Sequence, residues 1–173
     1  MSWEQESQAQ AAPPVALPSR KKSEVYWSGL TGRTLAADTN VDLVTFLKGL
    51  PAPTSGTLAP FFNTTSNKLN AYNDDSSLAF KINLVGSWST ISTYRSMQLD
   101  FEGTNGNRLV ASRDVAVTSD VITLATFLSI DKNGNIVTNG APLTIRSNRG
   151  TYTVTAILLI AEQVTKETAI TPV

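Results

Sequence analysis

The chain has 173 residues and contains neither cysteine nor histidine. Without cysteine there can be no disulfide bond, no thiolate catalysis and no cysteine-based zinc site. Without histidine the chain lacks the commonest general base and the commonest transition-metal ligand. We therefore expect a protein that is not an enzyme, with no catalytic residues, no bound metal and no cofactor.

Charge is also scarce. Charged residues make up 16% of the chain, and 14 Lys and Arg balance 14 Asp and Glu. The usual charged share is about a quarter, and a net charge of zero gives no field that attracts nucleic acid or an anionic membrane. The longest wholly apolar run, residues 156–161, is too short to cross a bilayer. We expect no nucleic-acid partner, no membrane partner and synthesis in the cytoplasm without a signal peptide.

Residues 1–22 differ in composition from everything that follows. Gln, Ala and Pro dominate this segment, and alone it cannot bury enough apolar surface to offset the entropy of ordering. Two interpretations stay open: a disordered tail, or an extended arm that becomes ordered on a partner. The second is favoured by an aromatic anchor of the kind found at interface hot spots. The predicted partner-binding residues of the arm are Trp3, Val15, Leu17, Arg20, Lys21 and Lys22.

The next part, residues 23–164, is predicted to be one β domain, and residues 165–173 a C-terminal tail. Residues 78–88 alternate apolar and polar, and we expect them to form a hairpin with residues 94–101. An Asn-Gly pair within residues 132–135 predicts a second hairpin. Eight or nine short strands separated by turn signals, with no long helical pattern, predict an all-β antiparallel sandwich. An eight-stranded jelly roll fits this size best.

The chain's most distinctive strand is predicted at residues 150–163, GTYTVTAILLIAEQ. It begins by alternating and then becomes apolar on both faces, so it needs cover on both faces. One face would meet the sandwich core and the other a neighbouring subunit. Because Ala156, Leu158 and Ile160 continue the face of Tyr152 and Val154, we assign them to the core. The predicted oligomer interface is then Ile157, Leu159 and Ala161.

Several side-chain groups could carry chemistry, and each has a simpler explanation. Paired carboxylates for glycoside hydrolysis could come from the acidic residues near strand ends, although such residues mostly face solvent. Oxygen-bearing residues at 131–135 and 73–75 suggest cation loops, but the ligands that complete a calcium loop are missing. Aromatic side chains could stack on sugars, but within strands they more often belong to a core or an interface. The carboxylates are Asp100, Glu102, Asp114 and Asp120, and the aromatic residues are Trp27, Trp88, Tyr26, Tyr72, Tyr94 and Tyr152.

Five stretches together resemble small jelly-roll structural proteins of tailed bacteriophages, a group that includes capsid cement proteins and trimeric tail-fibre knobs. They are FKINLVGSW, YRSMQLDFEG, the pair Arg113-Asp114, TFLSIDKNGNIVTNGAPLTI and GTYTVTAILLIAEQ. The resemblance implies a homotrimer, no enzymatic activity and a structural place in the virion. It assigns no binding residue to any position.

Two functions then compete. As a capsid cement, the protein would stand on the capsid surface as a trimer, with residues 1–22 spread over the major capsid protein. As a receptor-binding knob, it would dock to the tail through the arm, and loops such as residues 63–75 would meet a host glycan. Because no fibrous shaft precedes the domain in this sequence, cement is the main expectation and the knob the alternative. A non-viral, carbohydrate-binding sandwich is a third possibility.

Overall fold

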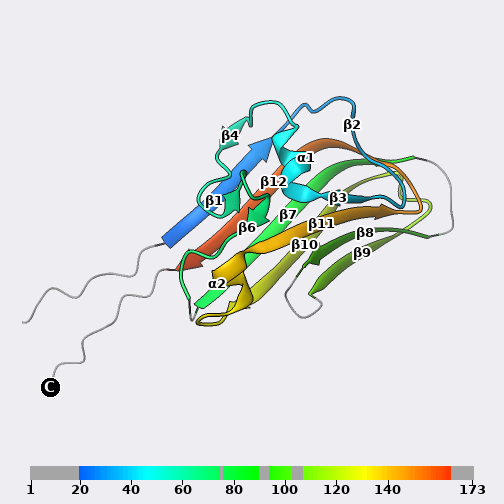
Figure 1. The fold of residues 1–173 in the computed structure, drawn as a ribbon. Coiled ribbons are helices and arrows are strands. Elements are labelled where there is room, and N and C mark those ends of the chain that lie inside the picture. The colour runs from blue at the N-terminus through cyan, green and yellow to red at the C-terminus, as the bar shows by residue number, and fades with distance from the viewer. Residues whose placement is uncertain (1–19, 75, 90–93, 103–106, 165–173) are drawn as a thin grey trace, which may run out of the picture.

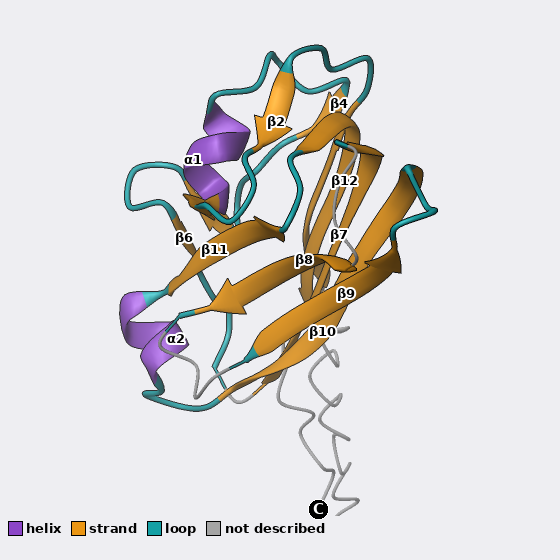
Figure 2. Ribbon diagram, turned by 90° about the vertical axis from the view of Figure 1, so that its right-hand side faces the viewer, coloured by secondary structure: helices purple, strands orange, loops and turns teal. Residues whose placement is uncertain are grey.

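The computed structural model describes residues 20–74, 76–89, 94–102 and 107–164, and it arranges them as two antiparallel sheets packed face to face (Figures 1 and 2). The β12 sheet has the strand order β10-β7-β12-β1-β4, with β2 also paired to β12. The β8 sheet has the order β5-β6-β11-β8-β9, with β3 also paired to β11. The elements in chain order are β1 (Arg20–Trp27), β2 (Arg33–Leu35), β3 (Asn40–Asp42), α1 (Leu43–Lys48), β4 (Ser55–Gly56), β5 (Phe62–Asn63), β6 (Lys68–Leu69), β7 (Ser76–Trp88), β8 (Tyr94–Phe101), β9 (Arg108–Asp114), β10 (Ser119–Ile130), α2 (Asn135–Asn139), β11 (Ala141–Asn148) and β12 (Tyr152–Val164).

The connections follow a jelly-roll path. The chain crosses between the sheets after β7, β9, β10 and β11, while β8 and β9 are neighbours in one sheet. Strands β1, β12, β7 and β10 face β3, β11, β8 and β9, which together make the eight strands of two interlocked Greek keys. The predicted all-β sandwich with jelly-roll topology is confirmed.

The core lies between the two sheets and follows the predicted alternation. In β7 the residues Leu78, Phe80, Ile82 and Leu84 are all buried. Their counterparts across the core are the buried residues of β8, and the rings of Phe80 and Phe101 meet edge to face with centroids 5.1 Å apart. Aromatic pairs of this geometry add to the energy of area burial. The sequence pattern therefore located the inward faces of these two strands correctly.

The predicted hairpin between residues 78–88 and 94–101 is wrong. Strand β7 pairs with β10 and β12, whereas β8 pairs with β9 and β11 in the other sheet. The Asn-Gly segment is no hairpin either, because β10 and β11 also lie in different sheets and α2 connects them. Asn133 does adopt a left-handed conformation with φ 59°, so the turn signal was real. The signal shows where the chain turns, but it does not show whether the strands before and after the turn pair with each other.

Strand β12 contains a bulge that inverts the predicted assignment of its two faces. Val154 pairs with Gly86 and Ala156 with Val85, so Thr155 is an extra residue. An extra residue shifts the side-chain alternation by one position. The core row therefore passes from Tyr152 and Val154 to Ile157, Leu159 and Ala161, which are all 0% exposed. Ile157, Leu159 and Ala161 are buried in the core of their own chain, so they cannot form the predicted subunit contact. The residues that were assigned to the core, Ala156, Leu158 and Ile160, lie on the outer face instead.

The boundary between the predicted arm and the β domain also differs from the prediction. Residues 20–22 belong to β1 and pair with residues 162–164 of β12, so the β domain starts before residue 23. Trp3, Val15 and Leu17 lie outside the described residues, as does the predicted tail 165–173.

Gly86 makes the bulge possible. A Cβ at this position would stand 2.0 Å from the carbonyl oxygen of Thr153 and 2.9 Å from the ring of Tyr152. We expect Gly86→Ala to destabilise the fold by about 1–3 kcal/mol, the usual cost of overpacking, because the clash involves backbone of the central strand. Thermal unfolding followed by circular dichroism measures this effect.

The matched control is Ser87→Ala, which changes an exposed side chain on the same strand. An unfolding temperature for Gly86→Ala equal to that of the control would show that the close approach of β7 and β12 does not determine stability.

Candidate functional site

Both ends of the described chain lie at one pole of the sandwich. Arg20 pairs with Val164 at the start of β1 and the end of β12 (Figure 1). Strand β12 has 13 residues, which at about 3.3 Å per residue places Tyr152 roughly 40 Å from this pole. The loop predicted to meet a glycan lies near the ends of the chain, because the backbone amides of Tyr72 and Asn73 donate to Gln163 Oε1 at 2.7 and 3.1 Å. We call the end at Arg20 and Val164 the terminal pole.

The basic residues of the predicted arm are engaged within the chain. Arg20 forms an ion pair with Glu162, and Lys22 forms one with Glu24. The ammonium of Lys21 lies 4.9 Å from the ring centroid of Tyr72. Of these contacts, the ion pair of Arg20 with Glu162 joins β1 to β12, and the structure describes no other part of the predicted arm.

The outer face of the β12 sheet carries many apolar side chains, with Lys81, Asn83 and Thr123 among them. Phe127 is 78% exposed, although phenylalanine is a typical core residue. Beside it is an open hollow of about 430 Å³, whose lining is mostly apolar and includes the charged residue Lys81. We call this surface the apolar face; its apolar side chains are those of Tyr26, Ala79, Val85, Val121, Ala125, Phe127, Ala156, Leu158 and Ile160.

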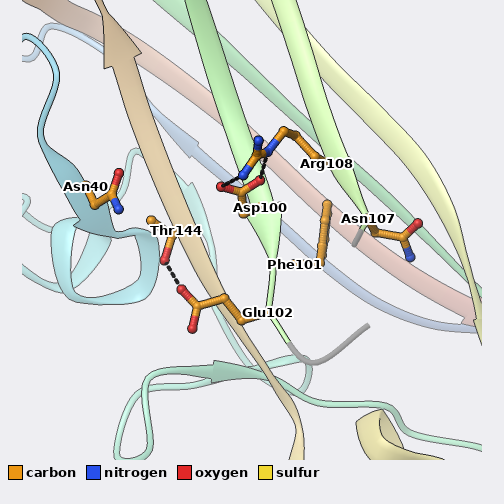
Figure 3. A pocket seen from close by; sticks show the side chains of 7 residues that line it. All are labelled: Asn40, Asp100, Phe101, Glu102, Asn107, Arg108 and Thr144. Carbon is orange, nitrogen blue, oxygen red and sulfur yellow. Dashed lines mark hydrogen bonds and ion pairs between the residues drawn. The ribbon is translucent and has the colours of Figure 1, made fainter. Parts of the chain in front are cut away.

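The outer face of the β8 sheet is polar. The pairings Thr144–Asp100, Asp100–Arg108, Arg146–Gln98 and Asn148–Ser96 place polar side chains in successive rows. Where β8 ends and β9 begins lies an open hollow of about 550 Å³. We call it the polar hollow; its polar lining residues are Asn40, Asp100, Glu102, Asn107, Arg108 and Thr144 (Figure 3).

An ion pair fixes one side of the polar hollow. Arg108 Nε donates to Asp100 Oδ1 at 2.5 Å, and Gln98 Nε2 donates to Asp100 Oδ2 at 2.7 Å. Burial alone would raise the pKa of the Asp100 carboxyl, but these hydrogen bonds and the charge of Arg108 together hold that pKa below its usual value. On the other side Thr144 Oγ1 donates to Glu102 Oε1 at 2.5 Å (Figure 3).

The remaining carboxylates predicted as hydrolytic candidates serve the fold. A hydrogen bond from Arg113 lowers the pKa of Asp120, and the backbone amide of Ala116 donates to Asp114 Oδ1 at 2.8 Å in the turn after β9. Glycoside hydrolysis requires a general acid with a raised pKa. Asp100 and Asp120 both show the opposite shift, so neither is suited to that role.

Of the two predicted cation loops, residues 131–135 are described in full, and residue 75 of the other lies outside the described residues. In the described part of the chain no three acidic residues gather in a way that could hold a metal ion. Asp131 accepts a hydrogen bond from Ser129 at 3.0 Å and closes the turn that leads to α2, as the turn interpretation predicted. None of the helices among the described residues has the length and apolarity needed to cross a bilayer.

The six aromatic candidates separate into core and surface residues. Trp27, Trp88 and Tyr152 are buried, and the Tyr152 hydroxyl donates to the carbonyl oxygens of Leu84 at 2.9 Å and Asp120 at 3.0 Å. Burial raises the pKa of Tyr152 well above its ordinary value. Tyr94 is 77% exposed and lies at the end of the polar face away from the terminal pole, while Tyr26 and Tyr72 are partly exposed.

One buried arginine could not be predicted from the sequence. Arg95 is 2% exposed, and its guanidinium donates to the carbonyl oxygens of Asp114, Val115 and Val117. It also lies 5.8 Å from the ring centroid of Trp88. Arg95 therefore ties the turn after β9 to the strands β7 and β8. The polar hollow was missed too, because its residues come from separate strands and only the sheet register brings them together.

Comparison with known proteins gives a consistent result. Residues 19–163 match the family described as the Sf6-type phage tail needle knob or tip of some Caudovirales. The chain is 50% identical over 145 residues to the tail needle protein of Shigella phage Sf6, covering 84% of this chain and 50% of that protein. The chain thus spans about half the length of this curated relative.

Solved structures show only distant likeness. The vertex protein P5 of PRD1 aligns with 84% of this chain and 73% of its own, with 11% identity and a TM-score of 0.49. The TNF protein Eiger of S. frugiperda aligns with 88% of this chain and 97% of its own, with 15% identity and a TM-score of 0.39. Neither likeness bears on function.

The family match covers nearly all of the described residues, and a close relative agrees with it. The match favours the knob alternative over the capsid cement that was the main expectation from the sequence. This chain belongs to the Sf6-type tail needle knob family and is a structural protein of a tailed-phage virion.

Proposed function

We propose that this chain is the knob at the tip of a phage tail needle, where it acts as a non-enzymatic homotrimer that contacts the host surface. The observation that carries this proposal is the family match over residues 19–163. The relative from Shigella phage Sf6 is named a tail needle protein and is about twice as long as the matched part. A longer relative allows a shaft and a knob in one protein, so the lack of a shaft in this sequence no longer favours cement.

The position of the chain ends supports a knob mounted on a shaft. Because Arg20 and Val164 are paired at one pole, a connection to the rest of the particle leaves from that pole whichever end of the domain continues. The opposite pole is then presented outwards. It includes the turns after β9 and β11, and Arg95 braces the turn after β9. An outward pole with a fixed turn suits a surface that meets a receptor.

The apolar face supports the homotrimer. A large exposed apolar patch on a soluble protein usually marks an interface. Burying a side chain such as Phe127, Leu158 or Ile160 is worth about 1.5–3 kcal/mol. Homo-oligomers normally close with cyclic symmetry, and the resemblance to trimeric phage proteins favours three subunits. The polar face of the β8 sheet lies on the other side of the sandwich and stays open in such an assembly.

The host-surface role predicts that the purified protein adheres to cells of the host and reduces infection when added before the phage. The reduction should rise with protein concentration, because the free knob occupies the receptor that the particle needs. Plaque counts after pre-incubation measure it. Binding to empty capsids, with a gain in their heat resistance and no adhesion to cells, would instead support a capsid cement that contacts the major capsid protein.

The homotrimer predicts that Phe127→Asp dissociates the assembly and leaves the fold intact, because the side chain is 78% exposed in the single chain. Light scattering coupled to size-exclusion chromatography should show the mass of a single chain, near 18.6 kDa, with the circular dichroism spectrum unchanged.

The control is Val110→Asp, which places the same charge at an exposed position on the polar face. The control should keep the mass of the trimer. If Phe127→Asp also kept that mass, the apolar face would not be the subunit contact.

A further inference from the structure

We propose that the polar hollow on the β8 sheet binds a carbohydrate unit that is neutral or positively charged. The proposal deepens the proposed function by locating a binding site, and it rests on that function only for the source of the carbohydrate, the host surface. The chemistry of the hollow and its position supply the argument.

The hollow has a suitable size and an open position. Its volume of about 550 Å³ lies within the range of roughly 300–1,000 Å³ that is typical of small-molecule sites. It lies at the end of β8 nearer the terminal pole, on the side of the domain opposite the apolar face, so an assembly through Phe127 and its neighbours leaves it accessible from the side. The apolar face has few polar groups to orient a sugar, whereas the polar hollow has several.

The lining offers donors and acceptors close together. The amides of Asn40 and Asn107 can donate and accept, the guanidinium of Arg108 donates, and the carboxylate of Glu102 accepts. A sugar hydroxyl is a donor and an acceptor at once, so a ring with adjacent hydroxyl groups matches such a mixture. A phosphate or sulfate group, which only accepts, would meet two carboxylates here.

The charges of the hollow set the preference among sugars. Asp100 and Glu102 bring two negative charges, and Arg108 brings one positive charge that is already paired with Asp100 at 2.5 Å. The lowered pKa of Asp100 keeps that pair ionised at neutral pH. The remaining charge is negative and belongs to Glu102, so the hollow should disfavour an acidic sugar.

The side chains of the hollow are held in place before a ligand arrives. Asn40, Asp100, Arg108 and Thr144 stand on β3, β8, β9 and β11, which are joined in one sheet (Figure 3). Gln98 orients the Asp100 carboxylate, and Thr144 orients Glu102. A site fixed in this way loses little entropy on binding.

The experiment uses the full chain and saturation-transfer difference NMR. The probes are the methyl glycosides of glucose, galactose, rhamnose and glucosamine, with glucuronic acid as the acidic probe. We expect transfer to at least one of the methyl glycosides and weaker transfer to glucuronic acid. Glu102→Gln and Arg108→Gln should each weaken binding by roughly ten-fold, as expected for losing a hydrogen bond to a charged group.

The matched control is Ser112→Ala, an exposed change on the same sheet face and outside the hollow. It should leave binding unchanged, and all three variants should unfold at the temperature of the parent. No transfer to any methyl glycoside, equal binding in all variants, or a preference for glucuronic acid would overturn the proposal.

The adhesion assay separates this proposal from the function on which it rests. A protein that adheres to host cells but binds none of the sugars keeps its role as a knob and loses the carbohydrate site. A protein that binds sugars through Glu102 and Arg108 without adhering to cells keeps the site and loses the proposed receptor role.

Discussion

The pairing of β12 with β7 on one side and β1 on the other is the constraint on which the rest of the structure depends. It forms the middle of the β12 sheet, brings Arg20 and Val164 to one pole, and places the bulge at Thr155 opposite Gly86. The bulge decides which residues of β12 enter the core. With Ile157, Leu159 and Ala161 inside, Leu158 and Ile160 face outwards and join Phe127 on the apolar face. One extra residue thus determines both the core and the surface that we assign to the subunit contact.

The two outer faces of the sandwich differ in chemistry, and this difference gives each face a role. The β12 sheet exposes Phe127, Val121 and Val85, while the β8 sheet exposes rows of Asp, Arg, Asn, Gln, Ser and Thr side chains. Exposed apolar surface of this extent is explained by a partner, and a polar surface by solvent or a polar ligand. In the proposed trimeric knob, the apolar faces would be hidden from solvent and the polar faces, with their hollows, would stay on the outside.

The sequence predicted the fold class and the inward rows of β7 and β8, because these depend on alternation within one strand. It could not predict the phase of β12 after Thr155, because that phase is set by Gly86 on another strand. Turn signals such as Asn133-Gly134 showed where the chain reverses, but the crossing between sheets depends on contacts far along the chain. The polar hollow could not be predicted because its residues come together only through the register of four strands. The burial of Arg95 could not be predicted because it depends on the carbonyl oxygens of a turn that only the fold brings close. The arm residues Trp3, Val15 and Leu17 lie outside the described residues, so their role stays a prediction.

The central claim is that the apolar face is covered in the assembled protein and the polar face is not. Hydroxyl-radical footprinting of the assembled protein tests this directly, because Phe127 and Tyr94 are 78% and 77% exposed in the single chain and stand on opposite faces. We predict that Phe127 is strongly protected from oxidation in the assembly while Tyr94 stays reactive. Equal oxidation of the two rings would contradict the account.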